Sequence, residues 1–209
     1  MKRLTTVLLA TVALLFASAC NSSPNASQQG SKSAAPAQKT EYLTGRGAFQ
    51  QLFVAARAFS PDVKPYRLVS NYTDGAPVNE GKAALWRLEV ASAARRAVKA
   101  FSWSGIAGSS DRGITHGTED AYNPDNTSTQ VFELPFLKID SDKAFEVAEQ
   151  HGGEKLMKKD PKQPVTFSLT FNARKSQLVW HVMYGSMPSD AKLTVYIDAT
   201  TGQFLRAEG

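Results

Sequence analysis

Residues 165–184 read VTFSLTFNARKSQLVWHVMY, and this stretch decides the fold class. Large apolar residues take every second position on both sides of residues 173–176, which is the two-residue period of half-buried β-strands. A short polar segment between two such strands predicts an antiparallel hairpin. Trp180 stands in the middle of the second apolar stripe, so we expect it in the core.

The sequence on either side extends this hairpin into a helix-and-sheet unit. Residues 193–197 alternate in the same way, and residues 203–206 follow a tight Asp-Ala-Thr-Thr-Gly turn as a last short strand. Upstream, Asp140 or Ser141 caps a helix that we expect to run to about residue 151, where two glycines end it. The predicted order is therefore one helix followed by antiparallel strands.

The first half of the chain repeats this order. Residues 45–59 carry apolar side chains at the spacing of an amphipathic helix. Three strands are predicted within residues 66–104. Two αβββ units, residues 43–104 and 139–209, predict an α+β protein whose helices pack on an antiparallel sheet. The pattern leaves open whether the two units form one continuous sheet.

The amino terminus carries an export signal. Residues 1–19 combine two cations, an apolar run and small residues at the end, which is the pattern of a secretory signal peptide. The chain's one cysteine, Cys20, follows directly, and the stretch resembles the lipobox of bacterial lipoproteins, with Ala17 where that pattern usually has Leu or Val. The resemblance implies lipidation at Cys20, and Asn21 implies an outer-membrane anchor facing the periplasm. Residues 21–40 contain no apolar side chain larger than Ala, so we expect residues 20–42 to form a flexible tether.

Residues 140–206 resemble a known envelope domain. The helix DKAFEVAEQHGG that begins at Asp142 and the closing run LTVYIDATTGQ that begins at Leu193 resemble the PepSY-type domain of bacterial envelope proteins and some protease propeptides. The resemblance implies a helix before an antiparallel sheet, and peptidase inhibition or protein–protein contact in the envelope without catalysis. Two segments, residues 154–164 and 185–191, are longer here than in the family pattern.

Composition and motifs exclude several classes of function. The chain has 209 residues, one Cys and three His, and its formal charge is +5, of which Lys2 and Arg3 of the signal contribute two. The remaining positive charge is weak and scattered, so we expect no nucleic-acid binding. No nucleophile elbow, phosphate-binding loop, dinucleotide fingerprint or paired-histidine motif occurs. We therefore predict no enzymatic activity, no catalytic residue, no cofactor and no metal site.

Residues 105–138 form the longest polar stretch, which we interpret as a loop and connector between the two units. Long loops in small domains are often functional, and four residues are our candidate contacts for a partner: Ile114, Asp120, Tyr122 and Asp125. A plain linking loop is the simpler interpretation. The oxygen-rich run around Asp125 lacks the ligand order of an EF-hand, so a calcium site is a weaker alternative.

These patterns predict a non-enzymatic cell-envelope lipoprotein that binds a protein or peptide through its sheet face or through the polar loop. The alternative is an envelope binding protein for a small ligand, such as a lipid or a polymer fragment, held between the sheet and the helices. A hydrolase whose site is assembled from distant residues is a third and weaker hypothesis. In each case the expected contact with the membrane is the lipid anchor at Cys20.

Overall fold

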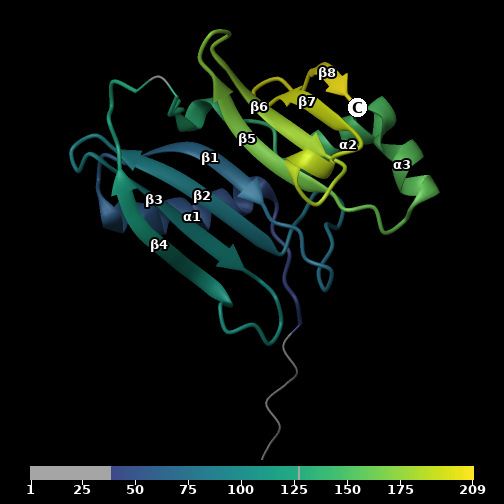
Figure 1. Ribbon diagram of the computed structural model, residues 1–209, viewed down its shortest axis with the longest axis horizontal. Helices are drawn as coiled ribbons and strands as arrows, with labels where there is room; N and C mark the ends of the chain where they lie inside the picture. The colour runs from purple at the N-terminus through teal and green to yellow at the C-terminus, as the bar shows by residue number, and fades with distance from the viewer. Residues whose placement is uncertain (1–38, 127) are drawn as a thin grey trace, which may run out of the picture. The chain divides into compact units, whose positions relative to one another are not determined.

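The computed structural model describes residues 39–126 and 128–209, so the predicted signal peptide, Cys20 and most of the tether lie outside the described residues (Figure 1). The first half contains α1 Gly45–Phe59, β1 Lys64–Ser70, β2 Leu85–Ser92, β3 Ala97–Ser104 and β4 Gly113–Ala121. The second half contains the 3-10 turn η1 Leu134–Phe136, α2 Ser141–Ala148, the π-turn η2 Glu149–Gly153, α3 Glu154–Lys159, β5 Thr166–Asn172, β6 Gln177–Met183, the 3-10 turn η3 Pro188–Asp190, β7 Thr194–Asp198 and β8 Phe204–Glu208.

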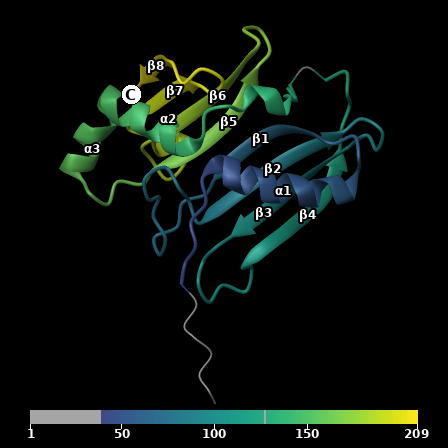
Figure 2. The same ribbon diagram turned by 180° about the vertical axis from the view of Figure 1, so that it is seen from behind.

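The strands form one antiparallel sheet in the order β4-β3-β2-β1-β5-β6-β7-β8. β1 and β5 are neighbours at the centre, where Leu68 lies opposite Leu169, and each half of the chain runs outward from them. α1 packs on β1, β2 and β3, and α2 packs on β6 and β7, so both helices cover the same face (Figure 2). No described helix covers the other face, which we call the open face. The predicted α+β class, with helices on an antiparallel sheet, is confirmed, and the two units share one sheet.

The helix-covered face holds the core because apolar residues take every second position of the strands. Trp86, Leu88 and Trp180 are at most 1% exposed and belong to one cluster of buried side chains. On α1, Phe49 and Leu52 are buried against the sheet at helical spacing. A large aromatic side chain buries about 150–250 Å². Apolar burial stabilises by about 25 cal/mol per Å², so each buried tryptophan contributes several kcal/mol.

The same hydrogen bond recurs in both halves. Trp86 of β2 donates from Nε1 to the carbonyl oxygen of Leu43 at 3.0 Å, and Trp180 of β6 donates to that of Ile139 at 2.9 Å. Each acceptor stands two residues before its helix begins. The indole therefore ties the start of each helix to the second strand of its own half, and the repeat seen in the sequence is a structural repeat.

The two helices begin at neighbouring points. The Oδ1 atom of Asp140 accepts hydrogen bonds from the backbone N–H groups of Ser141 and Arg46, at 2.7 and 2.8 Å. The Ser141 hydroxyl accepts from the N–H of Gly45 at 2.7 Å and donates to the carbonyl of Gly81 at 2.6 Å. Because helix N-termini carry unpaired N–H groups and a partial positive charge, one carboxylate stabilises the start of both helices.

We predicted that residues 105–138 form one long loop and connector. This prediction is wrong, because Gly113–Ala121 form β4. β4 pairs with β3 at the edge of the sheet, and all its residues after Gly113 are exposed. Ile114 is the one large apolar side chain in this strand, so the alternation that reveals a half-buried strand is missing. Each half thus has the order αββββ. The fourth strand of the second half is the short strand predicted at residues 203–206, whereas the fourth strand of the first half was not predicted.

The helix predicted from Ser141 to about residue 151 ends its regular turns at Ala148 and continues through η2 into α3. Gly152 has a φ of +113°, a conformation that residues with a Cβ rarely adopt. A Cβ on Gly153 would overlap the hydroxyl of Tyr184. The two glycines therefore bend the helix and make room for the tyrosine, whereas we predicted that they would end it.

Candidate functional site

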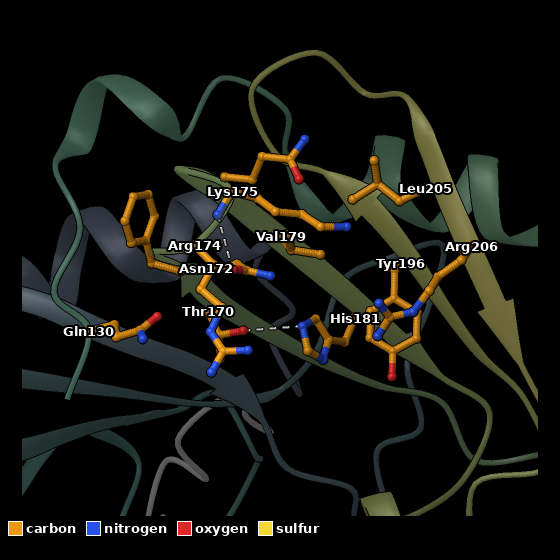
Figure 3. Close-up of a pocket in the computed structure, with 12 residues that line it drawn as sticks. Gln130, Thr170, Asn172, Arg174, Lys175, Val179, His181, Tyr196, Leu205 and Arg206 are labelled. Atoms are coloured by element: carbon orange, nitrogen blue, oxygen red, sulfur yellow. Dashed lines mark hydrogen bonds between the residues drawn. The ribbon is translucent and has the colours of Figure 1, made fainter. Parts of the chain in front are cut away.

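The open face of the second half is hollowed. Strands β5, β6 and β7 place every second side chain on this face, out of phase with the buried apolar residues. The hollow has a volume of about 820 Å³. It is lined by the side chains drawn in Figure 3: Gln130, Thr170, Phe171, Asn172, Arg174, Lys175, Gln177, Val179, His181, Tyr196, Leu205 and Arg206. We call it the open-face hollow.

His181 lies at the centre of this hollow, between side chains of the adjacent strands. Its Nε2 atom is 3.1 Å from Oγ1 of Thr170, and its ring centroid is 4.7 Å from that of Tyr196. Burial, and then the charges of Arg206 and Arg67, lower the pKa of His181 to about 4. The imidazole is therefore neutral near pH 7, and the centre of the hollow is polar without being charged.

Arg206 of β8 borders the hollow beside Tyr196. Its guanidinium carbon is 3.9 Å from the centroid of the Tyr196 ring, and its Nε atom is 2.9 Å from Oε1 of Glu208. The Tyr196 hydroxyl donates to Oε2 of Glu208 at 2.8 Å. Burial and this hydrogen bond raise the pKa of Tyr196, so the phenol stays protonated. Stacking on the ring holds the planar guanidinium at the edge of the hollow.

Two further cations, Arg174 and Lys175, stand on the turn between β5 and β6. The side chain of Asn172 accepts from the N–H of Lys175 at 3.3 Å, and that of Gln130 accepts from the N–H of Ala173 at 2.9 Å. The first bond closes the turn on itself, and the second ties the turn to the segment before η1. Within the described ranges, neither Arg174 nor Lys175 forms an ion pair. The lining of the hollow thus carries three cations and no carboxylate.

A second hollow of about 490 Å³ adjoins the first and shares Thr170, His181 and Tyr196 with it. This one reaches β1 at the centre of the sheet, where Arg67 lines it, and β8, where Glu208 lines it. Met187, which is 55% exposed, lies at its border. The two hollows together extend across the open face from β1 to β8.

The open face of the first half has a smaller hollow, of about 370 Å³. Its charged lining residues are Arg87, Glu89, Lys99 and Asp120. The Lys99 side chain turns to the helix-covered face, where its Nζ lies 5.2 Å from the ring centroid of Phe59 in α1. Arg87, the cation of this hollow on the open face, is paired within the protein, because its Nε lies 3.1 Å from Oε1 of Glu89.

The four contact residues that we predicted do not come together. Ile114 and Asp120 both belong to β4, but a bulge between them places them on different faces of the sheet. Tyr122 follows β4 and lines a small pocket beside Lys64. Asp125 is exposed in the next turn. None of the four lines the open-face hollow, and their role in binding stays a prediction.

Sequence reasoning missed the residues of the hollow because no motif joins them. Thr170, His181 and Tyr196 are far apart in the chain and become neighbours through the pairing of three strands. The available signal was the set of polar and aromatic residues that alternate with the buried ones. His181, between Trp180 and Val182, was the clearest of these.

A groove of about 680 Å³ beside α2 is rich in carboxylates, among them Glu80, Asp142 and Glu146. Nevertheless, no three His, Cys, Asp or Glu side chains in residues 39–126 and 128–209 are arranged to hold a metal ion. In these same ranges, every helix is too short or too polar to cross a bilayer.

Comparison with known proteins identifies a shared fold. No protein-family model matches the chain, and no curated protein matches it. A solved structure with a similar fold is that of a predicted lipoprotein from Clostridium difficile 630. The match has a TM-score of 0.51 at 9% sequence identity and covers 77% of this chain and 91% of the other. At this identity the likeness concerns the fold alone, and the resemblance of residues 140–206 to the PepSY-type domain stays a prediction.

Proposed function

We propose that this chain is a lipid-anchored protein of the bacterial cell envelope that binds a protein or peptide through the open face, without catalysis. The export signal and Cys20 directly behind it support the location, and we place the anchor in the outer membrane, facing the periplasm. The shared fold with a predicted lipoprotein is consistent with it. The observation that carries the binding role is the open-face hollow on the side of the sheet that no described helix covers.

The composition of the hollow suits a contact with another protein. Tyrosine and arginine are enriched among the residues that contribute most to protein–protein binding. Here Tyr196 and Arg206 are held on paired strands and stacked on each other, so little side-chain freedom remains to be lost on binding. Thr170, Asn172 and Gln177 offer hydrogen-bonding groups around them.

Site-specific photo-crosslinking in the source cells tests the binding role. A benzophenone side chain at position 170 lies in the hollow, and we expect it to form an adduct with one envelope protein. The matched control is position 54, because Val54 of α1 is 74% exposed and lies on the helical layer. Adducts of the same protein from both positions, or from position 54 alone, would refute binding through the open face.

The anchor is tested separately. We expect Cys20→Ser to abolish incorporation of labelled fatty acid and to release the protein from the membrane fraction. A Ser18→Ala variant, which keeps the cysteine, is the control. Membrane retention of the serine variant without fatty acid would contradict lipid anchoring.

A small-ligand role is the second candidate, and the size of the open-face hollow favours it. Its volume of about 820 Å³ falls within the range of roughly 300–1,000 Å³ that small-molecule sites occupy. The hollow lies on the open face, whereas our small-ligand hypothesis placed the ligand between the sheet and the helices. Native mass spectrometry of protein purified from the envelope distinguishes the two, since a bound small molecule would add a discrete mass.

A further inference from the structure

We propose that the open-face hollow binds acidic side chains, so that the partner presents an acidic peptide segment to it. This inference rests on the proposed function and names the chemistry of its partner. It is carried by the charges that line the hollow and by their contrast with the other half of the same face.

Two of the three cations that line the hollow have no carboxylate partner among the described residues. Arg174 and Lys175 stand on the turn between β5 and β6 and form no ion pair among the described residues. Arg206 has one carboxylate partner, Glu208, whose other oxygen is bonded to the Tyr196 hydroxyl. An anion beside Arg174 and Lys175 would therefore meet positive charge without displacing an internal partner, whereas at Arg206 it would share the guanidinium with Glu208.

This excess is a local property. In the first half, the charged side chains that line the small hollow on the open face are Arg87, Glu89 and Asp120, and Arg87 pairs with Glu89 at 3.1 Å. The neutral His181 adds no charge at the centre of the hollow near pH 7. Clustered cations at the larger hollow, and not at the small one, indicate complementarity to a partner of opposite charge.

The spacing of the cations suits a peptide better than a single small anion. Arg206 comes from β8, whereas Arg174 and Lys175 come from the hairpin turn, on the other side of His181 (Figure 3). Several carboxylates along one extended segment can each meet a cation, and the planar guanidinium of arginine can bind a carboxylate through two N–H groups. Between the cations, Thr170 offers a hydroxyl to a passing backbone.

Two pools of short labelled peptides test the inference with the purified protein. One pool carries Glu at alternating positions and random residues elsewhere, and the other carries Gln at the same positions. We expect the Glu pool to bind at least about tenfold more tightly, which is the effect of one well-placed charged contact. Binding should weaken as salt rises.

Charge-reversal variants test whether the Glu pool binds at the open-face hollow. We expect Arg174→Glu/Lys175→Glu to weaken binding of the Glu pool about tenfold or more. The control Lys155→Glu/Lys159→Glu makes the same change of charge at exposed positions of α3 and should leave binding unchanged. Both pairs are exposed, and thermal melts verify that each variant is folded.

Each outcome decides a separate claim. Equal binding of the two pools, or weakening by both charge-reversal variants alike, would overturn the acidic partner and leave open-face peptide binding intact. Failure of both pools to bind would overturn the acidic partner, and photo-crosslinking from position 170 then decides whether the open face binds a protein at all. Displacement of the bound Glu pool by inorganic phosphate or by vesicles with anionic lipid, at concentrations lower than those at which the Glu pool itself binds, would also overturn it in favour of a non-peptide anion.

Discussion

The two halves of the molecule have the same internal framework and different open faces. In each half, the tryptophan of the second strand donates to the carbonyl two residues before the helix. The next residue along that strand faces the open side and is Arg87 in the first half and His181 in the second. Opposite these residues on the following strand stand Ser102 and Tyr196. Equivalent positions thus carry an ion-paired surface in one half and an aromatic hollow in the other.

This difference separates the residues that make the fold from those that give the surface its chemistry. The buried positions repeat because both halves must pack a helix on the same sheet. The open positions have no such constraint, because a side chain there contacts solvent or a partner. For this reason our proposal of binding concerns the half whose cations Arg174 and Lys175 have no internal carboxylate partner among the described residues.

The largest expected effect tests the shared framework. We expect Trp86→Ala and Trp180→Ala each to lower the free energy of unfolding by about 3–5 kcal/mol, the usual cost of removing a buried large aromatic side chain. Urea denaturation followed by circular dichroism measures both. If one half tolerates the change while the other unfolds, the two tryptophans are not equivalent.

A smaller effect tests the point where the helices meet. Asp140 accepts from the start of both helices, whereas Thr44 accepts from Gly47 of its own helix alone. A single N-cap is worth about 1 kcal/mol, so we expect Asp140→Ala to cost about 2 kcal/mol and Thr44→Ala about 1 kcal/mol. Equal costs, measured by the same denaturation, would show that Asp140 stabilises one helix only.

His181, on the second half of the open face, makes the stability of the folded protein depend on pH. Its pKa falls from 6.5 to about 4 on folding. Between pH 6.5 and about pH 4, His181 therefore binds a proton in the unfolded chain but not in the folded protein. The free energy of unfolding is highest above pH 6.5 and decreases as the pH falls toward 4. We expect His181→Gln to remove this part of the pH dependence. An imidazole that titrates near 6.5 in the folded protein by NMR would contradict the burial of this ring.

The smallest expected effect concerns the ion pair of the first half. Arg87 and Glu89 have side chains that are 46% and 16% exposed, and exposed pairs contribute about 0–1 kcal/mol. We expect Arg87→Ala to change stability within this range and to leave binding to the Glu-containing peptides unchanged. A tenfold loss of that binding would move the site into the first half.

The sequence predicts the parts of this fold that rest on local periodicity. The strand with Trp86 and Leu88 alternates clearly, and so does the strand with Trp180, so both were expected together with their helices. β4 was missed because an edge strand with exposed residues on both faces has no apolar period. The bend at Gly152 was missed because two glycines can end a helix or bend it, and the packing of Tyr184 decides between them.

The site was harder to predict than the fold. Its members share no motif, since Thr170, His181 and Tyr196 become neighbours through strand register. The excess of positive charge at the hollow becomes visible only in the structure, where Arg174 and Arg206, which are far apart in the sequence, border one hollow. Such a property belongs to the assembled sheet and cannot be read from any single segment.

Photo-crosslinking from one position in each half of the open face is the most direct test of where the protein binds its partner. A benzophenone side chain at position 170 samples the second half, and one at position 102 samples the ion-paired surface of the first. We expect position 170 to give one discrete adduct with an envelope protein and position 102 to give none. An adduct from position 102 alone, or equal adducts from both positions, would contradict binding through the cationic half.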